Sequence, residues 1–219
     1  MNITENLQQI KASIPKYVTL VAVSKTKPNT AILEAYQTGQ RVFGENKIQE
    51  LTEKYESLPK DIEWHMIGHL QSNKVKYIAP FVSLIHGVDS FKLLEEINKR
   101  AAQNERVINC LLQIHIAEED TKFGFDDKEV MELIKSEAFQ QLKNIKIVGL
   151  MGMATFTDNE QQIRKEFRSL KNLFDKFQIY YLQFQILSMG MSGDYQIAIE
   201  EGSNMIRVGS SIFGERNYH

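Results

Sequence analysis

The chain has 219 residues, of which 42% are hydrophobic and 25% are charged, a composition typical of globular proteins and unlike that of disordered chains. Its 26 Lys and Arg residues and 28 Asp and Glu residues leave a net charge of −2, so it lacks the basic excess of most nucleic-acid-binding proteins and we expect no nucleic-acid partner. The N-terminal segment does not resemble an export signal, and no apolar run is long enough to span a bilayer. We therefore expect no membrane association.

A single domain covering residues 1–219 is expected, because no stretch rich in Gly, Ser or Pro divides the chain. The only cysteine, Cys110, cannot form an internal disulfide. This cysteine usage favours a reducing compartment and a cytoplasmic location.

Eight apolar runs rich in β-branched residues recur along the chain, and polar segments of helical periodicity separate them. The runs cover residues 18–24, 41–44, 63–68, 81–88, 107–116, 145–153, 180–189 and 204–210. Strands separated by helices pair in parallel, so the pattern predicts an α/β fold. Eight units favour a closed (β/α)8 TIM-like barrel, and an open doubly wound sheet is the alternative. Residues 3–14 predict an extra helix before the first strand, with Thr4 as its N-cap and an apolar stripe of Leu7, Ile10 and Ile14.

Lys25 directly follows the first apolar run, and functional residues of such barrels lie at the carboxyl ends of the strands. Because side chains alternate along a strand, Lys25 shares a direction with Val21 and Val23, toward the barrel interior or its mouth. A lysine in that place loses water, so its pKa falls and it becomes a nucleophile that can form a Schiff base. The alternative is a solvated lysine at the end of a strand.

Polar residues also follow the second and third runs. Asn46 can bond a ligand at the barrel mouth or cap the next helix. His65 and His69 have the i, i+4 spacing of some metal ligands, but Gly68 and the strand-like segment before it make a shared helical face unfavourable, and no third ligand is near. We therefore predict no metal site and expect His65 to line the pocket.

The seventh and eighth runs both end in turns rich in Gly and Ser, SMGMSGD at 188–194 and RVGSS at 207–211. Such turns present backbone N–H groups and hydroxyls that can hold an anion, and phosphate sites in these barrels frequently use the two loops after strands seven and eight. The alternative is a pair of ordinary turns with capping serines. Arg207 precedes Gly209 by two residues, so it should point into the barrel mouth and bond a phosphate or a ring nitrogen.

A lysine nucleophile, a phosphate site and an arginine together indicate pyridoxal 5'-phosphate (PLP), whose aldehyde reacts with a lysine. A second interpretation is an enzyme for phosphorylated sugars that uses Lys25 as a Schiff-base former without any cofactor. The residues considered so far leave both open.

Seven segments carry a resemblance to a known family. They are AVSKTKP at 22–28, FGENKIQE at 43–50, WHMIGHLQSNKVK at 64–76, TKFGF at 121–125, GLMGM at 149–153, LSMGMSGD at 187–194 and IRVGSSIFGER at 206–216. Together they resemble the pyridoxal phosphate homeostasis proteins over nearly the whole chain.

This resemblance implies a barrel like the N-terminal domain of alanine racemase, with Lys25 as the Schiff-base lysine and Arg207 facing the pyridine nitrogen. It also implies a phosphate site around Ser188, Gly190, Met191, Gly209 and Ser210. The TKFGF segment at 121–125 has no role that the sequence assigns.

The resemblance further implies a protein that binds and delivers PLP, with PLP-dependent apo-enzymes as recipients, and that keeps vitamin B6 and amino-acid pools in balance. Racemases of this type add a second domain and a dimer partner, whereas this chain ends at His219 soon after the eighth run, so we expect a monomer.

Racemisation needs proton transfer on both faces of a carbanion, and an arginine leaves the pyridine a poorer electron sink. We therefore expect little or no catalysis, with a small PLP-dependent amino-acid racemase or decarboxylase as the alternative.

Overall fold

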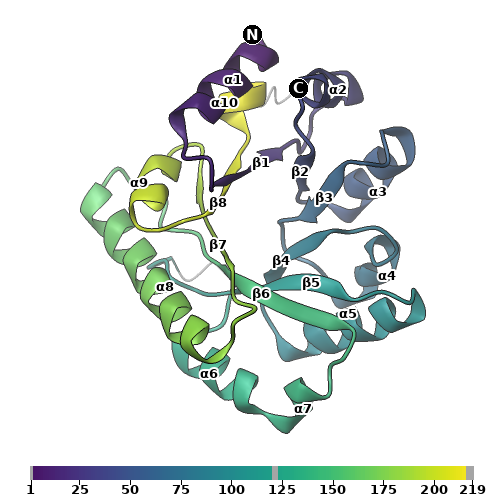
Figure 1. Ribbon diagram of the computed structural model, residues 1–219, viewed down its shortest axis with the longest axis vertical. Coiled ribbons are helices and arrows are strands. Elements are labelled where there is room, and N and C mark those ends of the chain that lie inside the picture. Colours follow the sequence, from purple (N-terminus) through teal and green to yellow (C-terminus); the bar gives the residue numbers. More distant parts are fainter. Residues whose placement is uncertain (1, 120–122, 216–219) are drawn as a thin grey trace.

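The computed structural model describes residues 2–119 and 123–215, and these residues form a closed barrel whose eight strands follow one another in chain order (Figure 1). Neighbouring strands are parallel, and the ring closes where the first strand pairs with the last, Ala22 opposite Val208. The closed barrel predicted from the eight units is confirmed, and the open sheet is excluded.

The strands of the described ranges are β1 Thr19–Val23, β2 Val42–Glu45, β3 Glu63–Met66, β4 Leu84–Val88, β5 Ile108–Gln113, β6 Ile145–Met151, β7 Ile186–Met191 and β8 Met205–Val208. The helices are α1 Ile3–Ser13, α2 Asn29–Gln37, α3 Ile48–Ser57, the 3-10 turn η1 Ser72–Lys74, α4 Val75–Ile78, α5 Phe91–Gln103, α6 Asp127–Lys135, α7 Glu137–Gln140, α8 Glu160–Tyr180, α9 Tyr195–Glu200 and α10 Ser210–Phe213. Within these ranges, no helix combines the length and the apolar composition that a membrane crossing requires.

The alternation of side chains along the strands produces two separate cores. One face of each strand packs against the surrounding helices in a large apolar layer that includes Ala22, Phe43 and Leu112. The other face points into the barrel, where Val21 and Leu84 belong to a small apolar cluster. Polar side chains that share this inner face therefore either stay buried in the barrel or reach its mouth.

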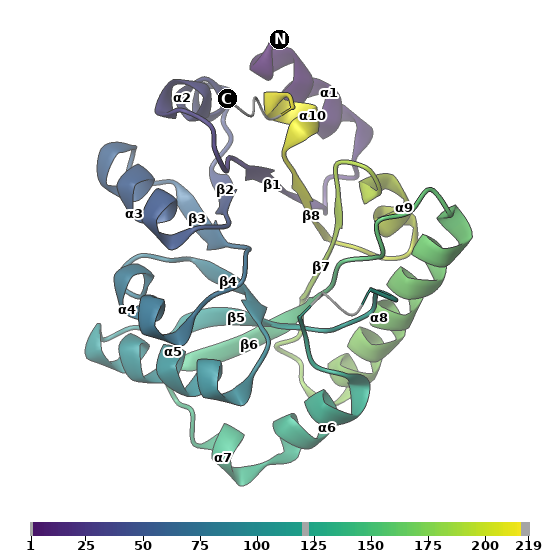
Figure 2. The same cartoon turned by 180° about the vertical axis from the view of Figure 1, so that it is seen from behind.

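The predicted extra helix is present as α1, which packs against α2 and α10 beside the end of the described chain (Figures 1 and 2). Leu7 and Ile10 are buried as expected. The predicted cap is wrong, because the helix begins one residue before Thr4 and Asn2 caps it, accepting a hydrogen bond from the Glu5 N–H at 3.1 Å. Asn6 Nδ2 donates to the Ile212 carbonyl at 3.0 Å and thus fixes α1 to α10.

The seventh strand begins later than its apolar run predicts. The helix α8 continues to Tyr180, and β7 begins only at Ile186. Between them the chain turns back so that Phe184 packs on Phe174 and Phe177 of α8, with ring centroids 6.4 and 5.3 Å apart. Tyr181 and Phe184, in the first half of this run, therefore pack on a helix instead of extending a strand.

Candidate functional site

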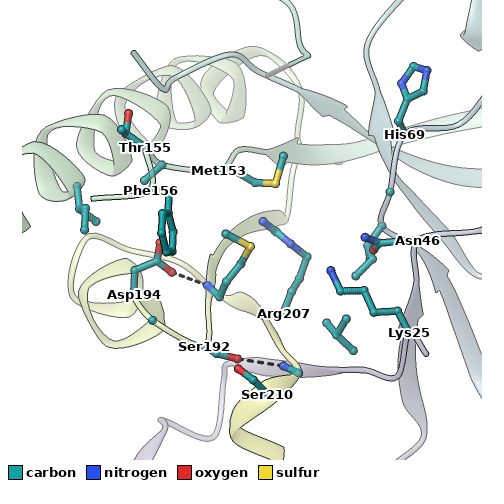
Figure 3. Close-up of a pocket in the computed structure, with 18 of the residues that line it drawn as sticks. Lys25, Asn46, His69, Met153, Thr155, Phe156, Ser192, Asp194, Arg207 and Ser210 are labelled. Carbon is teal, nitrogen blue, oxygen red and sulfur yellow. Dashed lines mark hydrogen bonds between the residues drawn. The ribbon is translucent and has the colours of Figure 1, made fainter. Parts of the chain in front are cut away.

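A cavity of about 690 Å³ opens at the carboxyl ends of the strands. Its walls include residues that follow β1, β2, β6, β7 and β8, and Figure 3 shows how their side chains surround it. This is the end of the barrel at which the sequence predicts the site.

Lys25 lines this cavity two residues after the end of β1. Val23 lines it too, and Val21 lies deeper on the same face, so the alternation expected from the sequence holds past the strand end. Lys25 is half-buried, and its side chain points toward the same part of the cavity as that of Arg207 (Figure 3). The fold thus brings a primary amine and a guanidinium together.

Below the cavity, Arg207 begins a chain of hydrogen bonds that continues into the barrel interior. Arg207 donates to Ser188 Oγ at 2.5 Å and to the Gly152 carbonyl at 3.1 Å. His86 Nδ1 lies 3.0 Å from Ser188 Oγ, and His86 Nε2 lies 3.0 Å from His65 Nδ1. A guanidinium only donates, so Ser188 Oγ accepts from Arg207. His86 Nδ1 is the other partner of Ser188 Oγ, and we assign the hydroxyl hydrogen to that bond so that it has an acceptor. We therefore assign the proton of each imidazole to Nε2.

Burial decides the charge of these groups. It lowers the pKa of His65 to about 3 and the pKa of His86 well below its ordinary value, where the positive charge of Arg207 adds to the effect. Burial also lowers the pKa of Arg207, to about 10. At neutral pH this chain of hydrogen bonds therefore contains one positive charge, on Arg207, and two neutral imidazoles.

One wall of the cavity is polar and comes from the loops after β7 and β8. Ser192 Oγ accepts a hydrogen bond from the Gly209 N–H at 3.2 Å, and the Met191 N–H donates to Asp194 Oδ1 at 2.6 Å (Figure 3). Ser210 adds a second hydroxyl beside Ser192. The two hydroxyls can donate hydrogen bonds close to the charge of Arg207, whereas the two amides already bond Ser192 and Asp194 in this structure.

The structure places most of the site residues predicted from the sequence on the cavity wall. Those that line it are Lys25, Asn46, Met191, Arg207, Gly209 and Ser210. Asn46 does not cap the next helix, because Lys47 holds the N-cap position of α3. Three predicted residues do not line the cavity: His65, Ser188 and Gly190.

His65 and Ser188 lie one layer deeper than expected. Both side chains are buried inside the barrel, where they bond to His86 and, for Ser188, to Arg207. They lie on the inner face of β3 and β7, and an inward residue reaches the cavity only where its strand ends. Ser188 therefore contacts Arg207 from below and does not line the cavity.

Gly190 faces away from the cavity because β7 contains a bulge. Ser188 pairs with Met205 and Met191 pairs with Arg207, so β7 has one more residue than β8 over this stretch. The extra residue moves Met191 to the inner face and turns Gly190 toward α9. A Cβ atom at Gly190 would lie 2.6 Å from Ala198 Cβ, so this glycine permits the close packing of α9.

Sequence reasoning missed Ser192 and His86. Ser192 belongs to the SMGMSGD segment, whose serines the sequence predicts as donors to an anion. The bulge determines which of the two serines reaches the cavity. His86 lies in an apolar run and had no motif to mark it. A histidine in a run otherwise apolar is a signal that could have identified it.

The rim of the cavity contains aromatic side chains on two sides. On the side opposite the polar wall, the Phe123 ring stacks on the His69 ring with centroids 4.5 Å apart. Phe156, which is 95% exposed, lies beside Asp194 (Figure 3). His69 Nδ1 bonds Asp89 at 3.1 Å at this rim, whereas His65 is buried in the barrel, so the two histidines do not act together. Residues 121 and 122 of the TKFGF segment lie outside the described part of the chain.

Within residues 2–119 and 123–215, no group of three or more Asp, Glu, His or Cys side chains is placed to hold a metal ion. The cavity instead combines an amine, a guanidinium and a wall of hydroxyl and amide groups with the apolar side chains of Ile67 and Met153. An amine can bond covalently to an aldehyde, and the polar wall suits an anion. These residues fit a planar, phosphorylated aldehyde.

Known proteins share this fold and much of this sequence. The family model for the N-terminal domain of alanine racemase matches residues 1–217. The pyridoxal phosphate homeostasis protein of Aquifex aeolicus is 43% identical over 91% of this chain and 87% of its own length. The protein of the same name from Haemophilus influenzae is 39% identical over 100% of this chain and 98% of its own length.

Solved structures agree with these similarities. PipY from Synechococcus elongatus PCC7942, solved with PLP bound, is 35% identical with a TM-score of 0.88, and the match covers 97% of this chain and 100% of PipY. An alanine racemase from Clostridium difficile 630 shares the fold, with a TM-score of 0.79 at 18% identity over 98% of this chain and 56% of the racemase. The chain therefore belongs to the alanine racemase N-terminal domain family and, within it, to the pyridoxal phosphate homeostasis proteins.

Proposed function

We propose that this protein binds PLP in the cavity at the carboxyl end of the barrel and serves in PLP homeostasis. The observation that carries the proposal is the convergence of Lys25 and Arg207 on one cavity, in a chain 35% identical to a protein solved with PLP bound. Lys25 Nζ bonds the aldehyde carbon as a Schiff base, with loss of water. Arg207 donates to the ring nitrogen, since its guanidinium has no acceptor and stays charged.

The phosphate of PLP is proposed to bind the polar wall opposite Lys25. Ser192 and Ser210 supply hydroxyl donors, and the Gly209 N–H, which bonds Ser192 Oγ in this structure, turns to the phosphate when that hydroxyl does. The backbone at Met191 completes the wall. Asn46 lines the side of the cavity next to Lys25. This assignment gives Ser192 the role that the sequence analysis expected for Ser188.

Lys25→Ala tests the covalent bond. We expect the wild-type protein, incubated with PLP, to show the visible absorption band of a lysine-bound imine, which borohydride reduction removes, and Lys25→Ala to show only free PLP. The fold should persist, because Lys25 contributes little to the core. Lys176→Ala, which replaces an exposed lysine of α8 outside the cavity, is the control and should keep the band. A borohydride-sensitive band in Lys25→Ala would refute the assignment.

We propose further that the protein holds and delivers PLP to PLP-dependent apo-enzymes with little or no turnover of amino acids. Arg207, with a pKa of about 10, does not supply the ring nitrogen with a proton at neutral pH and leaves the ring a poor electron sink. The monomeric state and the cytoplasmic location stay predictions from the sequence.

Chiral chromatography tests the proposed lack of turnover. Enzymes typically turn over about 10 times per second, and we expect alanine and serine incubated with the PLP-loaded protein to racemise orders of magnitude more slowly. An ordinary enzymatic rate that Lys25→Ala abolishes would favour the racemase alternative.

A further inference from the structure

A buried ionic cluster lies behind the turn that carries Lys25. It consists of Glu45 at the end of β2 and of Glu50 and Lys54 on α3. Lys54 Nζ donates to Glu45 Oε1 at 2.7 Å, to Glu50 Oε1 at 2.8 Å and to the Ser24 carbonyl at 2.8 Å. An ammonium group has three hydrogens, so these bonds use all of them. The side chain of Lys54 is 6% exposed and that of Glu45 is fully buried.

The cluster holds the backbone on both sides of Lys25. Before it, Ser24 bonds the cluster twice, through its carbonyl to Lys54 and through its hydroxyl, which donates to Glu45 Oε1 at 2.6 Å. After it, the Thr26 N–H donates to Glu50 Oε1 at 2.5 Å. Thr26 has φ = 64°, a left-handed conformation that is unfavourable for a β-branched residue. The Glu50 carboxylate therefore helps to hold a strained turn next to Lys25.

Stability alone does not explain this cluster. Removing charges from water is costly, and apolar side chains in place of a buried ion pair are often as stable or more so. Here the cost is increased because Glu45 Oε2 is buried without a hydrogen-bond partner. The cluster contacts both neighbours of Lys25, which points to a role in placing that residue.

We propose that Glu45, Glu50 and Lys54 are positioning residues that fix the backbone of Lys25 so that its amine reaches the aldehyde carbon of the ligand. This inference rests on the proposed function. In the reaction that it serves, the neutral amine adds to the carbonyl carbon and a carbon–nitrogen double bond forms. The carbonyl oxygen leaves as water with the two hydrogens of the amine. The cluster has no part in holding the phosphate, because Ser192, Gly209 and Ser210 lie on the opposite wall.

The test compares two ligands that differ only in their ability to form this bond. Pyridoxine 5'-phosphate has an alcohol in place of the aldehyde of PLP, so it uses the phosphate wall and Arg207 but cannot react with Lys25. We expect Glu50→Ala to weaken PLP binding by about tenfold or more, which corresponds to ~1.4 kcal/mol, and to leave the affinity for pyridoxine 5'-phosphate unchanged. Glu50→Gln keeps an acceptor for the Thr26 N–H and should restore much of the PLP affinity.

Asp175→Ala is the matched control, since Asp175 also pairs with a lysine one helical turn away, Lys171, but on α8. It should change neither affinity. If Glu50→Ala does not fold, Ser24→Ala removes the hydroxyl bond to Glu45 with a smaller change and should show the same selective loss.

Equal weakening of both ligands, or no change in either, would overturn the positioning role while leaving the proposed function intact. A wild-type protein that binds both ligands equally would overturn the proposed covalent bond, and the inference with it.

Discussion

Arg207 is the residue through which the barrel interior affects the site. Its guanidinium faces the cavity from the inner face of β8 and bonds Ser188 below, which in turn bonds His86. Because every side chain in this hydrogen-bonded series is buried and has a partner, the direction of the Arg207 side chain is fixed from inside the barrel. Ser188 and Ser192, only four residues apart, thus have different roles.

Replacing each serine separates these roles. Ser192→Ala should weaken binding of PLP by roughly tenfold or more, the effect of one lost hydrogen bond to a charged group, but not binding of pyridoxal, which lacks the phosphate. Ser188→Ala removes a contact of Arg207, which we expect to face the ring common to both ligands, so it should weaken both equally. Fluorescence titration gives the two affinities. An unchanged ratio of the affinities in Ser192→Ala would contradict the phosphate assignment.

The bulge in β7 is the feature of an element that shapes the site most. It brings Met191 opposite Arg207 and allows α9 to pack on Gly190, which has φ = +100°. In this conformation a side chain is strained, and here it would also meet Tyr195 Cα at 2.9 Å and Ala198 Cβ at 2.6 Å. The polar wall of the cavity therefore depends on a glycine that does not itself line it.

Gly39→Ala is the natural comparison for Gly190→Ala. Gly39 has a similar φ of +90°, but a Cβ atom there would have nothing within 4 Å. We expect Gly39→Ala to lower the free energy of unfolding by about 1–2 kcal/mol through backbone strain, and Gly190→Ala to lower it by roughly 1–3 kcal/mol more through overpacking. Urea unfolding measures both. Equal losses would show that α9 moves away at little cost.

At the scale of the whole molecule, the two buried histidines make stability depend on pH. Their pKa values are lowered in the folded state, to about 3 for His65, whereas in the unfolded chain they are near the ordinary value of about 6.5. The unfolded state thus binds more protons below pH ~6.5, so their contribution to stability is complete above that pH and is lost as the pH falls. Glu45 has the opposite effect on stability. Burial raises its pKa, so the folded state binds its proton more tightly than the unfolded state, and its contribution to stability falls as the pH rises.

A variant separates the histidine contribution from that of Glu45. Above pH ~7 the free energies of unfolding of the wild type and of His86→Asn should change with pH in parallel. Between pH ~6.5 and ~4 the variant should lose stability less steeply with falling pH, by up to about 1.4 kcal/mol per pH unit, the effect of one proton. Urea unfolding at a series of pH values gives the slopes. Identical slopes would mean that His86 is not buried in its neutral form.

Much of the architecture followed from the sequence because it depends on local pattern. Apolar runs alternating with amphipathic segments specify parallel strands and covering helices, and eight of them close a barrel whose site must lie at one end. The alternation of side chains along a strand also placed Lys25 and Arg207 at the cavity correctly. These are properties that a residue has by virtue of its own strand.

Tertiary structure decided which residues reach the cavity and which support it. The bulge in β7 turns Gly190 away from the cavity and brings Met191 to its wall. His65 and Ser188 lie inside the barrel below the cavity. The fold also brings His86 to Ser188, 102 positions away in the chain. The cluster of Glu45, Glu50 and Lys54 around Lys25 likewise needs β1, β2 and α3 to be packed together. Sequence periodicity determines the direction of a side chain, but register and depth come from the pairing of distant strands, and these the sequence alone did not determine.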